Sequence, residues 1–499
     1  MPLIEWFNNF ESILLYMILN SEQLKLNVAS EIGTLRALLI HSPDSGLGKV
    51  VPSKAQDWLF EDIVHLDTMR KNEYDYYIKL LLYFLDPDKI KGKLQDIDAP
   101  EAERNFYKPD HLDFYASEKV IEIQTLLAQI LEDQGIRDKL TASVCAIESC
   151  NYRLQQQLNN TPPVELAKIF ISGSLSKDQM IFAPIPNLIF SRDIGITINN
   201  HILINKPAKK ARSRETLLAR YILFNHPAFS NYRDNILEIT ESIQHFLRPG
   251  KDQDDKTTLE GGDVMVVSKN HVIIGCSERT SLSGAHEAIK LLFDHKVVEK
   301  VTVLKIPHKR DYMHIDTVFT QVKRNVWVIL GSLAKADTST KSESNPVSWF
   351  TDKKPKDRTE IVQFIAGENQ PRTFDCIEDL LNDISVNDLK SSEETQFIYS
   401  GNNTFPFDAR EQWTDSCNLL ALKEGVVLGY DRNDKTVEAF KQNGFQVVKV
   451  AELLQQFEDG LLTPDEMHDT LILMPSSELS RARGGFHCMS LPLLRDEIV

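Results

Sequence analysis

The sequence predicts an α/β protein built as a ring or propeller-like array of repeated strand–helix–strand units. Three observations support this prediction. Short apolar strands of one style recur along the chain, most of them lead after polar residues into a helical pattern, and two of those helices are followed by another β-branched strand. Repetition of one supersecondary unit favours such an array over a single open sheet.

The recurring strands stand well apart in the chain. They are LRALLIH (35–41), HILIN (201–205), HVIIG (271–275), VWVILG (326–331) and VVLG (426–429). Helical patterns follow three of them, at 214–224, 284–295 and 435–444, and the further strands are VEKVTVLKI and FQVVKV. Each unit therefore has the strand and the helix that pack as neighbouring layers in α/β proteins.

Two interruptions make the spacing of the units uneven. Between 76 and 180 helical periodicity dominates, as in YYIKLLLYFL and in EKVIEIQTLLAQILEDQGI, whose end is marked by a glycine stop signal. Between about 332 and 398 the chain is polar and rich in Ser, Thr, Lys and Pro, which is typical of an exposed insertion. We therefore divide the chain into a helical N-terminal extension (1–27), an α/β catalytic domain (28–75 and 181–499, including the insertion at about 332–398) and an inserted helical domain (76–180).

Composition limits the kinds of partner. The formal net charge of -16 over 499 residues argues against nonspecific binding to nucleic acid or to an anionic membrane, because both need a basic face. The apolar run Ile13–Leu19 is too short to span a bilayer. The six cysteines form no Cys-x-x-Cys pair, and no His/Cys cluster has zinc spacing. We therefore expect a reducing, cytoplasmic location, no disulfide framework, and neither a metal nor another cofactor.

Five short polar stretches beside strands or turns are candidates for chemistry. Taken alone, each has an ordinary structural explanation, because glycine pairs are mostly turns and an isolated cysteine is more often an inert buried thiol. Together they supply one Cys, one His and several carboxylates without metal spacing, which suits nucleophilic attack on a cationic carbon. The stretches are FSRD (190–193), EGGD (260–263), MHID (313–316), REQWTDS (410–416) and RARGGFHC (481–488).

Local patterns support a shared site. Alternation along a strand would put His314 and Asp316 on one face, so that both project into one cavity. The glycine pair after Glu260 removes side chains there and lets backbone or ligand come close. Cys488 follows a Gly-Gly turn at the end of a basic loop, and we expect its thiol at a mobile rim.

With these stretches the sequence resembles the arginine deiminases, in the guanidine-modifying superfamily that also holds agmatine deiminases, dimethylarginine hydrolases and amidinotransferases. The matching motifs occur in the family's order over residues 28–75 and about 181–499, outside the insertion. The resemblance implies a five-unit pseudo-symmetric α/β propeller with an inserted helical domain, in agreement with the repeats. The motifs include PNLIFSRD (186–193), LEGGDVM (259–265), MHIDTVFT (313–320), REQWTDSCNLLAL (410–422) and SELSRARGGFHCMSLPLLRD (477–496).

The resemblance also implies a reaction, the cofactor-free hydrolysis of L-arginine to L-citrulline and ammonia. Cys488 would attack the guanidinium carbon and form a covalent amidino-thioether, and the bound cation would favour its thiolate. His314 would act as general acid and base, with Glu260 orienting and charge-stabilising it. Asp193 and Asp316 would grip the guanidinium by charge-assisted hydrogen bonds.

Arginine also carries a carboxylate, and the resemblance assigns three arginines to it. Arg212, Arg279 and Arg483 would bind that end of the substrate, because the fork of an arginine binds a carboxylate bidentately. Asn187 and Phe190 would line the pocket. Agmatine lacks the carboxylate, so these arginines favour arginine as the substrate.

Some positions depart from the family pattern. Ala482 stands where the family usually has Gly, which would stiffen a lid that must close over substrate, and Thr414 replaces the usual Asn. His487, next to the nucleophile, is a second candidate base. Because adjacent side chains usually point apart, we rank it below His314.

Two other functions remain open at the level of sequence. An amidinotransferase would form the same intermediate and pass the amidino group to an amine, but neither a water-excluding lid nor a second amine site is recognisable in the sequence. A non-catalytic descendant would serve as a binding or scaffold protein, and the intact set of five catalytic residues argues against it. The family also leads us to expect a homo-oligomer.

Overall fold

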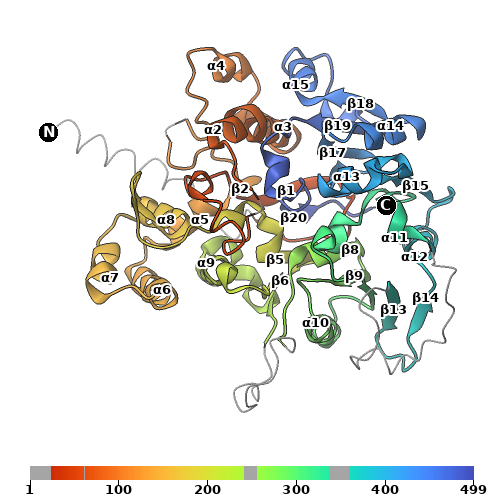
Figure 1. The fold of residues 1–499 in the computed structure, drawn as a ribbon, viewed down its shortest axis with the longest axis horizontal. Helices are drawn as coiled ribbons and strands as arrows, with labels where there is room; N and C mark the ends of the chain where they lie inside the picture. The colour runs from red at the N-terminus through yellow and green to blue at the C-terminus, as the bar shows by residue number, and fades with distance from the viewer. Residues whose placement is uncertain (1–23, 61, 112, 241–255, 336–358, 499) are drawn as a thin grey trace.

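The computed structural model describes residues 24–60, 62–111, 113–240, 256–335 and 359–498. Within these ranges the chain has a mixed α/β fold whose strands form six separate sheets. In Figure 1 the helices α6 (Gln134–Ile147), α7 (Tyr152–Asn159) and α8 (Pro163–Ser172) form a lobe on the left, beside the sheets. The predicted N-terminal helix falls mainly on residues 1–23, outside the described residues.

Five of the six sheets repeat one arrangement, in which a central strand pairs antiparallel with one neighbour and parallel with another. The five central strands coincide with the five predicted apolar strands, so that prediction is confirmed. They are β1 (Leu35–Ile40), β6 (His201–Ile204), β9 (His271–Cys276), β12 (Val326–Ile329) and β17 (Val426–Tyr430). The antiparallel neighbours are β20 (Leu491–Arg495), β5 (Gly195–Ile198), β8 (Val264–Ser268), β11 (Phe319–Lys323) and β16 (Leu420–Lys423). The parallel neighbours are β2 (Val120–Glu122), β7 (Ile236–Glu238), β10 (Lys300–Lys305), β15 (Gln396–Tyr399) and β19 (Thr470–Met474).

Other strands extend these sheets or stand apart. β18 (Gln446–Lys449) pairs with β19, and β3 (Ser174–Ser176) forms a small hairpin with β4 (Gln179–Met180). The three predicted helices are present as α9 (Ser213–Asn225), α10 (Leu282–Asp294) and α14 (Asp434–Gln442). The Ser281 side chain caps α10 by accepting a hydrogen bond from the Gly284 N–H, which satisfies one of the orphan donors at a helix start. The remaining helices are α2 (Leu66–Thr68), α3 (Asp75–Leu85), α4 (Leu94–Asp98), α5 (Ile123–Ile130), α11 (Gly331–Ala334), α12 (Ile377–Asp383), α13 (Phe407–Trp413) and α15 (Val450–Glu458).

The segment 118–136 differs from its predicted helix. Its first part is the strand β2, which runs parallel to β1 with Leu38 opposite Val120. The helix α5 then ends at Ile130, and α6 begins after the N-cap Asp133, so Gly135 lies inside a new helix instead of ending the old one. The apolar periodicity was compatible with either state, and pairing with a distant strand decided it.

The second half of the predicted insertion is folded into the sheets. β13 (Glu360–Ile365) pairs with β10, and β14 (Arg372–Phe374) pairs with β13. The helix α12 buries Ile377, Leu380 and Leu381 in the hydrophobic core around β12. Residues 360–399 are therefore ordered, whereas residues 336–358 lie outside the described part of the chain.

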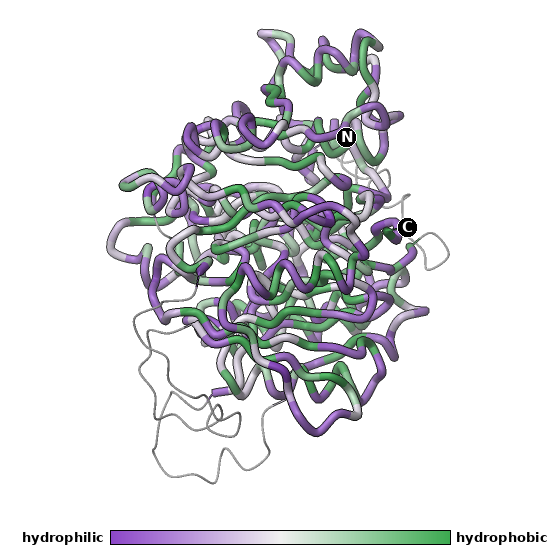
Figure 2. Tube along the Cα trace, turned by 90° about the vertical axis from the view of Figure 1, so that its right-hand side faces the viewer, coloured by the Kyte–Doolittle hydropathy of each residue, from purple (hydrophilic) through white to green (hydrophobic). Residues whose placement is uncertain are grey.

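Hydrophobic residues fill the space between the sheets and their helices. Figure 2 shows hydrophobic stretches running through the middle of the trace, with hydrophilic ones along many outer loops. One core joins α3 to β17 and β19 and includes Cys488 and Phe486, so the C-terminal loop is packed against the helix that follows the first unit. Among the described residues, no helix combines the length and apolar character needed to cross a membrane.

Candidate active site

The five candidate catalytic residues stand on loops that lead into the antiparallel strands of four units. Because the units are similar, equivalent loops from different units meet at one place. Asp193 lies in a 3-10 turn (Ser191–Ile194) before β5, Glu260 precedes a 3-10 turn (Gly261–Asp263) before β8, His314 and Asp316 stand at a 3-10 turn (Ile315–Thr317) before β11, and Cys488 precedes β20. His314 and Asp316 are therefore not on a strand, as their spacing suggested, but at the turn that precedes one.

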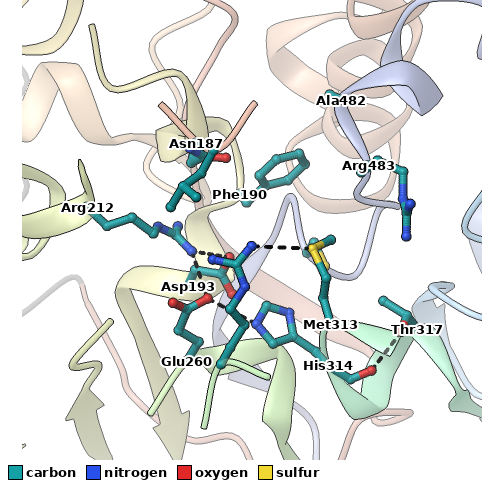
Figure 3. Close-up of a pocket in the computed structure, with 13 residues that line it drawn as sticks. Asn187, Phe190, Asp193, Arg212, Glu260, Met313, His314, Thr317, Ala482 and Arg483 are labelled. Carbon is teal, nitrogen blue, oxygen red and sulfur yellow. Dashed lines mark hydrogen bonds and ion pairs between the residues drawn. The ribbon is translucent and has the colours of Figure 1, made fainter. Parts of the chain in front are cut away.

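One pocket collects nearly all of these side chains (Figure 3). Nine of the ten candidates line it, and Asp316 lies beside it in contact with Cys488. Arg212 and Arg483 enter from opposite sides. The nine are Asn187, Phe190, Asp193, Arg212, Glu260, Arg279, His314, Arg483 and Cys488, and the sequence did not single out the further lining residues Leu59, Met313 and Thr317.

The thiol of Cys488 is buried and lines the pocket. Its Sγ lies 3.2 Å from Asp316 Oδ2 and accepts a hydrogen bond of 3.2 Å from Asn418 Nδ2. Burial raises the pKa of the Cys488 thiol well above its usual value, and the nearby carboxylates of Asp316, Asp193 and Asp415 raise it further. The unliganded thiol is therefore neutral at pH 7, and a bound cation would favour the thiolate.

The side chains of His314 and Glu260 form a buried pair. His314 Nε2 lies 3.1 Å from Glu260 Oε2. Burial opposes the charged ring, but the carboxylates of Asp193, Asp263 and Glu260 outweigh it and raise the pKa of His314 to about 10. The ring is therefore a cation able to donate a proton. A Cβ at Gly262 would lie 2.4 Å from His314 Nδ1, so the predicted close approach at the glycine pair is real.

Asp193 and Asp316, the two carboxylates predicted to bind a guanidinium, differ in their hydrogen-bond partners. Asp193 Oδ2 accepts a hydrogen bond of 2.7 Å from Arg212 Nη1, which also lies 3.2 Å from Glu260 Oε2. Asp316 Oδ1 is buried and accepts no hydrogen bond from any residue that the structure describes. Asp193 is therefore already paired with Arg212, whereas Asp316 keeps one buried oxygen without a partner among the described residues.

The other candidate arginines keep donors within the pocket. Arg279 donates from Nη2 to Met313 Sδ at 3.6 Å, whereas its buried Nε has no hydrogen-bond partner among the described residues. The guanidinium of Arg483 stacks on the ring of Trp413, 3.5 Å from the centroid. Such stacking fixes the plane of the fork.

The remaining two candidates shape the wall. Asn187 Nδ2 donates to the Trp58 carbonyl at 2.8 Å, which ties this side of the pocket to the loop that carries Leu59. A Cβ at Gly484 would lie 2.2 Å from the ring of Phe190. The glycine is thus needed for the close packing of the Arg483 loop against Phe190.

A second set of buried residues surrounds Cys488 and Asp316. His487 Nδ1 lies 2.9 Å from Asp316 Oδ2, and its Nε2 lies 3.3 Å from Glu31 Oε2. His487 does not line the pocket, which agrees with its lower rank as a base. Asn418 holds Cys488 twice, because its Oδ1 also accepts the Cys488 N–H at 3.1 Å. Glu31 and Asn418 had no role in the sequence analysis, although Asn418 precedes β16 and so occupies a position equivalent to the other site loops.

Three pocket residues have the spacing of a metal site. The ligand atoms of Asp193, Glu260 and His314 all lie within 4.8 Å of one another. However, Arg212 already neutralises both carboxylates, and a protonated His314 offers no lone pair to a metal. With these partners in place, the three residues do not fit a metal ion.

A buried thiol, a protonated imidazole held by a carboxylate, and an open carboxylate oxygen are the groups of a site for nucleophilic attack on a small cationic molecule. Comparison with known proteins gives the class a name. The family model "Arginine deiminase" matches residues 96–455, and the chain belongs to the arginine deiminase family.

Curated relatives match nearly the whole chain. "Arginine deiminase" from Staphylococcus aureus strain JH9 is 30% identical over 488 residues, which cover 95% of this chain and 99% of the relative. The protein of the same description from strain Newman is 29% identical over the same coverage. Among solved structures, an amidinotransferase from Microseira wollei covers 94% of this chain and 97% of its own at 12% identity, with a TM-score of 0.42. That similarity is too low to bear on the fold or function.

Proposed function

We propose that this protein hydrolyses the guanidinium group of L-arginine to L-citrulline and ammonia through a covalent intermediate on Cys488. The observation that carries the proposal is the position of Asp316. Its Oδ2 contacts Cys488 Sγ at 3.2 Å, while its buried Oδ1 has no hydrogen-bond partner among the described residues. A guanidinium bound at Oδ1 would therefore sit next to the nucleophile. Membership of the arginine deiminase family supports arginine as the substrate that carries this guanidinium.

Binding would bring a cation into a ring of carboxylates. The substrate guanidinium would donate to Asp316 Oδ1 and to Asp193 by charge-assisted hydrogen bonds. Its charge offsets the carboxylates that keep Cys488 protonated, so the thiol would lose its proton to solvent as the substrate binds. The thiolate would thus form only when there is a carbon for it to attack.

Attack and release would use the charge of His314. As the sulfur bonds to the guanidinium carbon, the protonated His314 would give its proton to the departing nitrogen, and ammonia would leave. The neutral ring would then take a proton from water. The resulting hydroxide would add to the amidino carbon, and the bond to sulfur would break. The new hydroxyl group would then lose its proton to the departing thiolate or to solvent, which leaves citrulline and the free cysteine. Glu260, 3.1 Å from the ring, would stabilise the charged state at each end of the cycle.

The α-carboxylate would be recognised by the arginines that line the pocket. Arg279 and Arg212 each keep a buried nitrogen without a hydrogen-bond partner among the described residues, and Arg483 lies across the pocket from Arg212. Buried donors of this kind are expensive to leave unpaired. A carboxylate would satisfy them, which favours L-arginine over agmatine.

The broader expectations also stand as proposals. We infer that the five repeated sheets correspond to a five-unit propeller, with 76–180 as the inserted helical domain and 28–75 and 181–499 as the catalytic domain. The repeated strand pairing supports this division. The six free cysteines support a reducing, cytoplasmic location. We expect no cofactor, and a homo-oligomer on grounds of the family alone.

Product analysis tests the proposed reaction. Purified protein is incubated with L-arginine, and citrulline and ammonia are measured, with Cys488→Ser as the control. We expect equal amounts of the two products from the wild type and neither from the variant. Transfer of the amidino group to added glycine or ornithine, with little citrulline, would instead identify an amidinotransferase.

A further inference from the structure

The loop that carries Arg483 is held by a single buried carboxylate from the start of the chain. Glu73 lies in a π-helical segment (Met69–Tyr74) and is only 2% exposed. Its Oε1 accepts hydrogen bonds from the Ser477 hydroxyl at 2.5 Å and the Glu478 N–H at 2.8 Å. Its Oε2 accepts from the Leu479 N–H at 2.7 Å. Every one of these donors belongs to the loop, and π-helical turns often accompany functional sites.

These donors lie at the beginning of a short helix, and Arg483 is the residue that follows its last residue, Ala482. At the start of the 3-10 helix Leu479–Ala482, the N–H groups of Glu478 and Leu479 have no acceptor within the helix. Glu73 satisfies them from another part of the chain. Since the helix is only four residues long, its direction fixes the direction of the next residue, Arg483.

Arg483 itself needs such support. Its backbone has φ 60° and ψ 68°, in the left-handed region that residues other than glycine rarely adopt. A strained residue persists only where its surroundings hold it on both sides. Tyr430 holds the far side by donating from its hydroxyl to the Gly484 carbonyl at 2.8 Å, and Glu73 holds the near side. The two anchors aim the Arg483 guanidinium into the pocket.

We propose that Glu73 is a positioning residue that sets the affinity for the substrate's carboxylate end by fixing the loop that carries Arg483. The inference rests on the proposed function for the identity of the substrate. Glu73 touches neither the pocket nor the reacting groups. Its loss should therefore weaken binding while the chemistry at Cys488 continues.

The test is Glu73→Gln, which keeps the shape but points an NH2 group at loop N–H donors. We expect KM for L-arginine to rise about tenfold, as for one lost charge-assisted contact, while kcat falls by less than about threefold. Ser477→Ala removes one of the hydrogen bonds and should shift KM in the same direction by about two- to threefold. The matched control is Glu458→Gln, because Glu458 also accepts backbone N–H groups, those of Gly92 and Leu94, away from the pocket.

Binding is measured separately from turnover. Calorimetry with L-arginine on Cys488→Ser, with and without Glu73→Gln, should show the same weakening of about tenfold. Unchanged binding and KM in both Glu73→Gln and Ser477→Ala would overturn the inference, as would an equal rise in KM with Glu458→Gln. A wild type that binds arginine but makes no citrulline would refute the proposed reaction and leave this binding test decisive.

Discussion

Replacing Asn418 by alanine should slow the enzyme without unfolding it. Asn418 is 1% exposed and contacts Cys488 through both ends of its amide. The variant loses the Nδ2 donor 3.2 Å from the sulfur, and with it a hydrogen bond that strengthens when the thiol ionises. The thiol pKa, already raised by burial and by Asp316, would rise further. Fewer enzyme–substrate complexes would then hold the reactive thiolate.

The magnitude follows from the charge on the acceptor. A hydrogen bond to an ionised group contributes about 1.5–3 kcal/mol, which converts to a loss of about 10- to 100-fold in kcat/KM. Because the loss comes from the thiol pKa, the acidic limb of the pH–rate profile should move to higher pH. The deficit should shrink as the pH rises.

Steady-state citrulline production across a pH series measures both effects. The matched control is Asn325→Ala, since Asn325 is 2% exposed and its amide donates to the Glu393 carboxylate and the Glu394 carbonyl, away from the pocket. Both variants should lose comparable stability, but Asn325→Ala should keep the wild-type rate and profile. Activity of Asn418→Ala within about twofold of wild type, with an unmoved acidic limb, would refute the reasoning.

Three further predictions concern stability, geometry and metal. His41 is buried between Glu122 and Asp44, and although burial opposes its charge, these carboxylates raise its pKa from 6.5 to about 9. The charged His41 ring therefore stabilises the fold fully below about pH 6.5, and this contribution is lost as the pH rises through about 9. In the His41→Asn variant, Tm should fall less steeply over that pH range than in the wild type. An equally steep fall in the variant would contradict this prediction. Gly262→Ala should displace the His314 ring, because the new Cβ would lie 2.4 Å from Nδ1. The displacement should lower kcat by about 100-fold. A normal kcat in a folded variant would show that the position of the ring is not critical. Dialysis against a strong chelator should leave citrulline formation unchanged, and recovery only after added metal would show that the Arg212-neutralised cluster holds an ion after all.

The fold was predictable where the signal was local and repeated. The five central strands were found because each is a short apolar run, and a helical pattern follows three of them. The strand β2 was missed because its three residues belong to an apolar stretch with a helical pattern. They form a strand by pairing with β1, about 80 residues earlier in the chain, with Leu38 opposite Val120. Sequence composition likewise marked 332–398 as exposed, whereas β13 and α12 are held by contacts with β10 and the β12 core.

The site was predictable to the extent that its residues sit in motifs. Ten residues were named, and the structure gathers nine around one pocket with Asp316 beside them. Their local geometry was less accessible: periodicity suggested a strand at His314, where the chain makes a 3-10 turn. Asn418 and Glu31 act through contacts with residues far away in sequence, so no spacing marks them. Asn418 lies within the quoted motif at 410–422, and the equivalence of the loops before β5, β8, β11, β16 and β20 would have singled it out there.

The central claim is that Cys488 attacks a guanidinium carbon, and trapping the intermediate tests it most directly. Protein mixed with L-arginine is quenched in acid within a turnover, digested, and analysed by mass spectrometry. We predict that the peptide containing Cys488 gains the mass of arginine less ammonia. The other five cysteines should be unchanged, and Cys488→Ser should show no such gain. Citrulline formed by the Cys488→Ser variant, or an adduct found on a different residue, would contradict the account.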